Sequence, residues 1–355
     1  MGIVIPHQMK GNFEVNLKGS EISLSVLDQS PVRSGGTAQQ AVRESVLLAQ
    51  AVDRLGYTRY WVAEHHNMRG LASTAPEVLI GHIAASTKGI RVGSGGVMLS
   101  HYSPLKVAES FNLLAALHPD RIDLGIGRAP GSDARTARAL ASAENPLDLN
   151  NFPEQLMNLY GFLSGEFPKD HQFQGISAQP LGETIPDLWL LGSSAVGSEY
   201  AAELGWSFCH AHFINPHSAR SSFDAYRKLF SPSPIRATPR TSIGVSVLCA
   251  ETHAEAERLS WSRWGWRLMG HVSSGGIPSV EEAQAFNYNE AELEALEDMK
   301  QRSIYGDPSE VRAQLLELGD KYDTDEFVIV TITHDFKHRV RSYELLAEAF
   351  ALQPR

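Results

Sequence analysis

Two adjacent histidines, His65 and His66, end an apolar run that reads Trp61-Val62-Ala63-Glu64. Successive side chains of a strand point to opposite faces, so one of the two histidines can face an interior site. A neutral imidazole exchanges protons near pH 7, which suits acid–base work. The alternative is that both histidines only cap backbone groups at the end of a strand.

Three glycines lie within a second apolar run, Val92-Gly93-Ser94-Gly95-Gly96-Val97-Met98-Leu99. Glycine weakens a strand, so its use here needs a reason. A flat ring that lies directly against the backbone would require a wall without side chains, and Gly95-Gly96 would supply one. A β-bulge at a bend of the sheet is the alternative.

Two further glycine-containing segments, Leu124 to Gly131 and Leu191 to Ser198, suit a phosphate group. The hydroxyls of Ser193 and Ser194, together with the free N–H groups at the start of a helix, form an anion site that Arg128 can close. A helix terminus offers an anion about 0.3–1 kcal/mol, whereas a hydrogen bond to a charged group contributes about 1.5–3 kcal/mol. Arg128 is therefore expected to matter more than either serine, and the serines can also cap the helix.

A sheet whose strands end together must position these segments. From residue 21 onward, short apolar runs alternate with longer helical patterns, and few hairpin turn signals occur. Strands are predicted over 22–27, 57–64, 90–99, 121–127, 188–191, 206–213, 243–250 and 326–333. Eight strands with their helices indicate an α/β fold, a (β/α)8 TIM barrel, with its site at the carboxyl ends of the strands. A doubly wound open sheet is the alternative, but no glycine fingerprint follows the first strand.

The pattern predicts a single domain over residues 21–355 and an N-terminal tail, residues 1–20, outside the fold. The apolar run in this tail is broken at Pro6 and is too short for a secretion signal. The interval between the seventh and eighth strands is far longer than an ordinary loop. We predict that it holds a helical insertion with a lid, at about residues 262–304.

The composition argues against several classes of partner. The formal net charge is −10 and no basic cluster occurs, so neither nucleic acid nor an anionic membrane surface is expected to bind. The chain also lacks the roughly 20 uninterrupted apolar residues of a spanning helix. Cys209 and Cys249 are the only cysteines, and each lies within an apolar run. They are predicted to be buried, reduced thiols, as expected in the cytoplasm.

A metal hydrolase is a further alternative, because His210 and His212 share one face of a strand. No matching carboxylate or histidine pair ends another strand, so no metal is predicted.

Taken together, the motifs resemble the bacterial luciferase-like monooxygenases. The resemblance rests on Leu24 to Asp28, the block Tyr60-Trp61-Val62-Ala63-Glu64-His65-His66-Asn67, Ala75 to Ile80, Arg91 to Leu99 and Arg121 to Asp133. It covers residues 22 to about 250 and the last strand.

The resemblance implies a flavin-dependent monooxygenase that uses reduced FMN, delivered by a separate flavin reductase, and O2. The substrate would be a small organic molecule, such as an aldehyde or an aromatic or polyketide-like compound, and the protein would be a homodimer. It also implies a set of site residues: His65 as the catalytic histidine; Gly95, Gly96 and Val97 behind the flavin ring; and Arg128, Ser193, Ser194 and Gly197 at the phosphate.

The sequence departs from the family's pattern beside the glycine run. Ser100 stands where the subgroup commonly has proline, and His101 follows it. His101 is therefore a candidate for substrate contact. His212 is a second candidate. Gly127 replaces the cysteine of light-emitting members, which argues against light emission. Two other functions stay open on the same barrel: an F420-dependent oxidoreductase and a non-catalytic flavin-binding protein.

Overall fold

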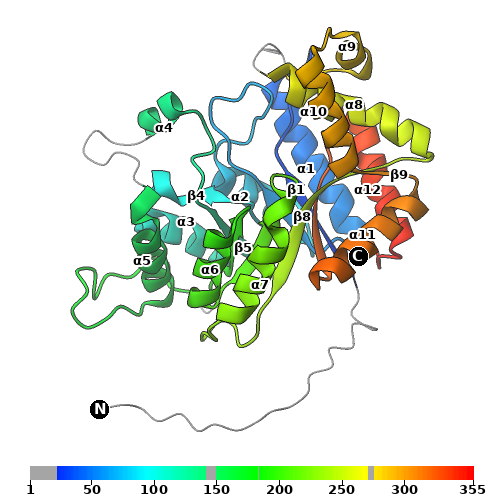
Figure 1. Ribbon diagram of the computed structural model, residues 1–355. Helices are drawn as coiled ribbons and strands as arrows, with labels where there is room; N and C mark the ends of the chain where they lie inside the picture. Colours follow the sequence, from blue (N-terminus) through cyan, green and yellow to red (C-terminus); the bar gives the residue numbers. More distant parts are fainter. Residues whose placement is uncertain (1–21, 141–148, 183, 271–275) are drawn as a thin grey trace.

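The computed structural model describes residues 22–140, 149–182, 184–270 and 276–355, and its centre is a closed barrel of eight parallel strands (Figure 1). The strands pair in the order β10-β1-β2-β3-β5-β6-β7-β8, and β10 also pairs with β8, which closes the barrel. The predicted (β/α)8 barrel is confirmed and the open sheet is wrong. The eight barrel strands are β1 Ser23–Asp28, β2 Arg59–Val62, β3 Arg91–Ser94, β5 Ile122–Gly127, β6 Asp187–Gly192, β7 Ser207–Ala211, β8 Thr241–Cys249 and β10 Glu326–Val330.

Helices cover the outside of the barrel, and their first residues explain where they start (Figure 1). Thr37 and Gln40 form a capping box at the first helix, and Asp307 and Glu310 form another. These reciprocal bonds satisfy N–H groups that a helix start leaves unpaired. The covering helices are α1 Ala38–Arg54, α2 Pro76–Ser86, α3 Pro104–Leu117, α5 Phe152–Ser164, α6 Ala195–Leu204, α7 Ala219–Leu229, α11 Pro308–Tyr322 and α12 Phe336–Ala349.

Shorter elements lie in the loops at the carboxyl ends of the strands. The predicted third strand is broken after β3 and resumes as β4 (Val97–Met98), which pairs with β5. The others are η1 Leu99–His101, α4 Ala134–Leu140, η2 Leu149–Asn151 and η3 Pro216–Ser218.

The interval after β8 contains helices, as predicted, and it also forms a strand that the sequence pattern did not predict. It holds α8 (His253–Met269), α9 (Val280–Ala285) and α10 (Glu290–Arg302). β9 (Ile304–Gly306) then pairs in parallel with the end of β8. Because α8 runs without a break through residue 262, the insertion has no boundary there. Part of the predicted lid, residues 271–275, lies outside the described residues, as do residues 1–20.

The barrel interior changes from ionic at one end to apolar at the other. At the amino ends of the strands, the buried Arg59 guanidinium binds Asp123 at 2.7 Å and Glu326 at 2.6 Å. Above this layer Trp61 and Trp189 meet edge to face, with ring centroids 5.2 Å apart. The side chains that follow toward the carboxyl ends are apolar. They form a hydrophobic layer in the upper half of the barrel interior, and we call this layer the floor. None of the described helices is long and apolar enough to cross a membrane.

Candidate functional site

A cavity of about 380 Å³ opens above this floor, where the carboxyl ends of the strands meet. Leu27, Trp61 and Leu191 give it an apolar base. Six of the seven predicted cofactor residues line it: Gly95, Gly96, Arg128, Ser193, Ser194 and Gly197. The seventh, Val97, does not; its buried side chain packs in the core between sheet and helices.

Gly95 and Gly96 form a wall in which there is no room for side chains. A Cβ on Gly95 would lie 2.6 Å from Leu27 Cδ1, and one on Gly96 would lie 2.8 Å from the Gly125 carbonyl oxygen. Both distances are shorter than a carbon tolerates. The peptide bond between them is cis, and the strand breaks here, so the bend expected as an alternative is also present. The wall is smooth backbone that faces the cavity.

The cavity also has a polar part, and no carboxylate is among the described residues that line it. The exposed Arg128 guanidinium makes no ion pair with the described residues. Ser194 is the N-cap residue of α6, yet its hydroxyl does not bond to the helix backbone, so the capping bond expected from sequence is absent there. A free hydroxyl, a helix start and an unpaired guanidinium together suit a phosphate.

The neighbouring loop holds the segment of Ser193 and Ser194 in place. The Ser193 carbonyl accepts hydrogen bonds from Asn215 Nδ2 at 3.2 Å and from Ser218 Oγ at 2.7 Å. Gly197 lies at the start of α6 beside β6, and a Cβ added there would make only an ordinary contact, 3.7 Å from the Gly192 Cα. The segment is therefore fixed before any ligand arrives.

His65 does not line the cavity, although Trp61 on the same segment does. Its Nδ1 is buried and has no hydrogen-bond partner among the described residues. Burial, and then the neighbouring His66, lower the pKa of His65 to about 4. The imidazole is therefore neutral at neutral pH.

Glu64 is a functional candidate that the sequence reasoning missed. Its buried carboxylate accepts from Tyr102 Oη at 2.6 Å and from the Met98 N–H at 2.9 Å, and lies 2.7 Å from His66 Nε2. Burial and the hydrogen bond to Glu64 raise the pKa of Tyr102. The carboxylate thus ties the His65-His66 segment to the segment that follows the glycine wall. A charged residue directly before the histidine pair was the only signal in the sequence.

His101 does not line the cavity and has a structural partner in the loop that does. Its Nε2 lies 2.7 Å from the Pro130 carbonyl oxygen, and Ser100 Oγ donates to the Arg128 carbonyl oxygen at 3.4 Å. Both contacts hold the loop that carries Arg128. Contact between His101 and a substrate stays a prediction.

The histidine pair considered as a metal site is not arranged as one. His210 Nε2 donates to the Asn215 carbonyl oxygen at 3.0 Å, while His212 lines a neighbouring cavity. In the described ranges no three His, Cys, Asp or Glu side chains could hold a metal together. Both cysteines are free and buried, as predicted. Burial raises the pKa of Cys209, which faces the main cavity, to about 12.

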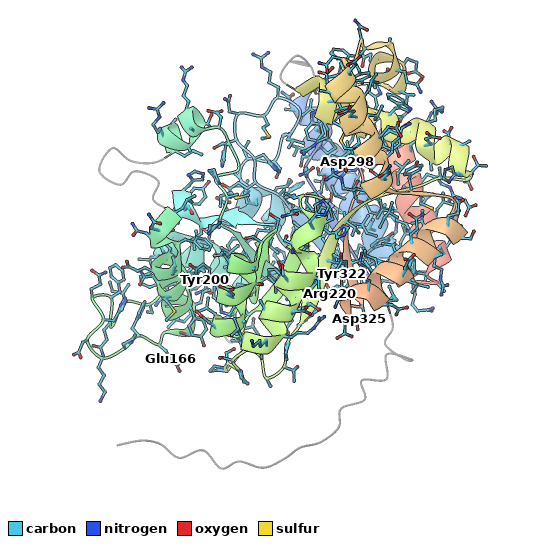
Figure 2. All side chains as sticks on the ribbon, viewed as in Figure 1. Glu166, Tyr200, Arg220, Asp298, Tyr322 and Asp325 are labelled. Carbon is cyan, nitrogen blue, oxygen red and sulfur yellow. The ribbon has the colours of Figure 1, made fainter. Side chains whose placement is uncertain are left out.

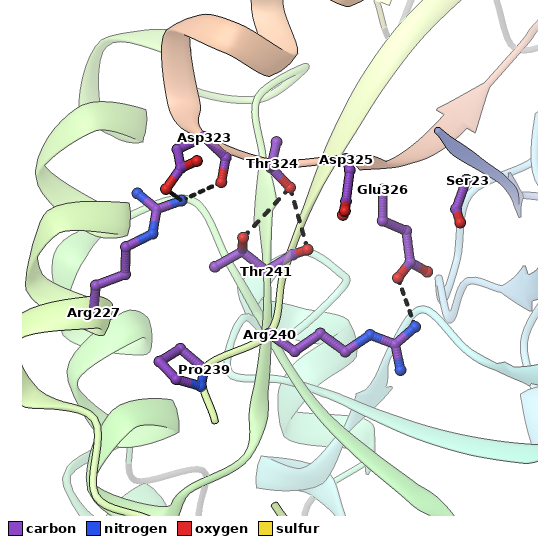
Figure 3. A pocket seen from close by; sticks show the side chains of 9 residues that line it. All are labelled: Ser23, Arg227, Pro239, Arg240, Thr241, Asp323, Thr324, Asp325 and Glu326. Carbon is purple, nitrogen blue, oxygen red and sulfur yellow. Dashed lines mark hydrogen bonds and ion pairs between the residues drawn. The ribbon is translucent and has the colours of Figure 1, made fainter. Parts of the chain in front are cut away.

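A larger cavity of about 460 Å³ lies at the other end of the barrel, between the amino ends of β1, β8 and β10 (Figure 3). Both of its arginines have carboxylate partners: Arg240 binds Glu326 at 2.7 Å and Arg227 lies 3.7 Å from Asp323. Thr241 and Thr324 bond between them (Figure 3). Ligand chemistry in such barrels belongs to the opposite end, so this cavity is structural.

The parallel βα barrel with a cavity at the carboxyl ends of its strands defines the class of protein, and comparison with known proteins supplies the family. The family model for luciferase-like monooxygenases matches residues 22–324. The chain belongs to the luciferase-like monooxygenase family.

Individual relatives agree along nearly the whole chain. The uncharacterised protein YwcH of Bacillus subtilis (strain 168) is 45% identical over 332 residues, covering 93% of this chain and 99% of the relative. The N-acetyl-S-alkylcysteine monooxygenase of the same organism is 39% identical, covering 92% and 98%. The crystal structure of apo-MsnO8 superposes with a TM-score of 0.85 at 42% identity, over 94% of this chain and all of that one.

Proposed function

We propose that this protein is a flavin-dependent monooxygenase that uses reduced FMN and O2 to oxidise a small organic substrate. The observation that carries the proposal is one cavity with a side-chain-free wall at Gly95 and Gly96 and an unpaired Arg128 on its polar side. These two features fit the planar ring and the phosphate of a single flavin mononucleotide.

Each group of cavity residues has a separate proposed role in holding the flavin. Arg128, Ser193, Ser194 and Gly197 would hold the phosphate, and Gly95 with Gly96 would lie against the ring. Bound reduced flavin supplies the electrons that activate O2. The apolar side chains of Leu27, Trp61 and Phe213 keep water away from that chemistry.

His65 is proposed to move a proton during turnover. Its neutral imidazole has a buried Nδ1 without a partner among the described residues, so a water or ligand that reached this atom would exchange a proton with it. The Glu64–Tyr102 contact would position the segment that carries it.

The identity of the cofactor is the part most open to a direct test. A monooxygenase component that shares the fold at 18% identity and a TM-score of 0.69 was solved with FMN, and a dehydrogenase at 12% identity and 0.65 was solved with an F420 adduct. We prefer FMN because a relative at 39% identity over 92% of this chain is named a monooxygenase, whereas the F420 dehydrogenase shares only the fold. A separate flavin reductase and a homodimer are proposed with it.

The experiment combines purified protein with NADH, a flavin reductase and FMN, and follows O2 and products by electrode and mass spectrometry. N-acetyl-S-alkylcysteines are one substrate set to include, since a relative is named for them. Product that carries one atom of 18O from 18O2 supports the proposal. Tight F420 binding with hydride transfer would replace FMN in it, and flavin that binds but never turns over would make the chain a binding protein.

A further inference from the structure

A second, smaller cavity adjoins the flavin site at the carboxyl ends of β7 and β8. It measures about 80 Å³, and Phe213 and Ile214 line both cavities. Ser246 of β8 and His212 also contribute to its wall. We call it the side cavity. A ligand in the flavin site could extend one group past Phe213 and Ile214 into it.

Three arginines line the side cavity, and no carboxylate does. Arg263 and Arg267 come from α8, and Arg302 comes from α10. Arg302 is paired with Asp298 (labelled in Figure 2), which lies one helical turn before it. Within the described ranges, neither Arg263 nor Arg267 has an ion pair or a hydrogen bond.

The charge on Arg263 is therefore uncompensated inside a partly buried site. Burial, and then Arg267, lower the pKa of Arg263 to about 10, which still leaves it protonated at neutral pH. An unpaired charge that has lost part of its hydration is costly, and a protein keeps one where a ligand supplies the counter-charge.

Buried and half-buried arginines elsewhere in the barrel have carboxylate partners. Arg59 in the barrel base, Arg240 at its amino end and Arg339 of α12 each bind a carboxylate at 2.6 or 2.7 Å. Figure 3 shows the pairing of Arg240. Arg263 and Arg267 differ from these three in having no carboxylate partner among the described residues, and both line the same cavity.

We infer that the side cavity binds an oxyanion of the substrate, a carboxylate or a sulfonate, while the apolar part of the substrate extends past Phe213 toward the flavin. This inference rests on the proposed function in one respect: the flavin would oxidise the end of the substrate that lies outside the side cavity. The volume fits one small oxyanion, since a liquid water occupies about 30 Å³. Arg263 and Arg267 would supply charged donors, and Ser246 a neutral one.

The test measures binding without relying on turnover. Hexanoate and its uncharged counterpart hexanamide are titrated calorimetrically into flavin-free protein and into protein saturated with oxidised FMN. Hexanoate should bind at least tenfold more tightly than hexanamide, a difference of about 1.4 kcal/mol. The double variant Arg263→Gln with Arg267→Gln should lose this preference and keep its affinity for hexanamide and FMN.

A control on the same helix distinguishes the loss of a cavity arginine from the loss of one positive charge elsewhere on the protein. Arg258 of α8 pairs with Glu255 and does not line the cavity, so Arg258→Gln should keep the preference for hexanoate. Arg267→Gln alone tests the inference if the double variant fails to fold, because Arg267 is exposed and should be replaceable.

Each outcome separates the two proposals. Equal affinity of the wild type for hexanoate and hexanamide would overturn the oxyanion site. Loss of FMN but not riboflavin binding in the double variant would show that these arginines hold the flavin phosphate instead. A preference for hexanoate in protein that binds no flavin would leave the oxyanion site standing and would remove the proposed function.

Discussion

Gly95 packs directly against Trp61: a Cβ added to Gly95 would lie 3.0 Å from the Cβ of that tryptophan. The backbone at the glycine wall thus lies on the aromatic floor of the barrel with no spare space. The indole of Trp61 is itself fixed, because its Nε1 donates to the buried Asp123 at 2.9 Å. The wall that faces the flavin site is consequently held from below by the ionic base of the barrel.

Substitution of the second wall glycine should damage both folding and ligand binding. In Gly96→Ala the new methyl would meet the Gly125 carbonyl oxygen and the Gly127 nitrogen, at 2.8 and 3.0 Å, and backbone atoms cannot rotate away. We expect a loss of about 1–3 kcal/mol in unfolding free energy and weaker flavin binding. Gly192→Ala is the control for stability, since its Cβ meets nothing closer than 3.7 Å. Urea unfolding of both variants decides the point, and equal stability would contradict the account of the wall.

The ion pair between Asp28 and Arg339 should control stability in acid. Burial acts to raise the pKa of the Asp28 carboxyl, but Arg339 at 2.6 Å and hydrogen bonds from Ser45 and Tyr60 offset it, so the pKa lies below its ordinary value. A carboxyl whose pKa is lowered by folding stabilises the protein above its unfolded pKa, about 3.9, and loses this contribution as the pH falls through the folded value.

Asp28→Asn should therefore cost about 3–5 kcal/mol at pH 7, because it leaves Arg339 charged and buried. The difference from wild type should shrink below pH 3, which urea unfolding across pH would reveal. Asp224→Asn, at an exposed pair with Arg220, is the matched control and should change stability little. A pH-independent difference would refute the assignment.

His65 should titrate far below an ordinary histidine. Burial and His66 lower its pKa to about 4, so it stays neutral from pH 5 upward. NMR of protein with 13C-labelled histidine should show one imidazole with no transition near pH 6.5, and His65→Gln should remove that signal. Because a neutral His65 is the proposed proton carrier, kcat/KM should show no histidine limb between pH 6 and 7. A His65 midpoint near 6.5 would be inconsistent with its burial.

Tyr102→Phe tests the contact that holds the histidine segment. The variant removes the 2.6 Å hydrogen bond to the buried Glu64, and such a bond to a charged group contributes about 1.5–3 kcal/mol. The melting temperature should fall, while FMN binding should change little, because neither residue lines the flavin site. Tyr160→Phe, which removes a hydroxyl without a hydrogen-bond partner among the described residues, should leave the melting temperature unchanged. Equal behaviour of the two variants would argue against a role for Glu64.

The sequence was sufficient to predict the barrel, because apolar runs at regular intervals and helix starts such as Thr37-Gln40 are local signals. It was also sufficient to bring most of the candidate residues to one cavity, since strand ends converge in a parallel barrel whatever their order. Six predicted residues line one cavity for this reason.

What could not be predicted depends on contacts between distant segments. Glu64 meets Tyr102 only because two loops fold over each other, and Arg263 reaches the side cavity only because α8 packs beside β8. The family resemblance placed Val97 behind the ring, but the chain breaks between β3 and β4 and the side chain packs in the outer core. Periodicity carries no information on such breaks.

The most direct test of the central claim compares FMN with riboflavin by fluorescence titration, because these ligands differ only in the phosphate. Wild-type protein should bind FMN at least tenfold more tightly than riboflavin, and Arg128→Gln should abolish the difference by weakening FMN alone. Arg135→Gln, a nearby exposed arginine outside the cavity, should behave as wild type. Equal affinity for the two ligands in the wild type, or an unchanged preference in Arg128→Gln, would contradict the flavin site described here.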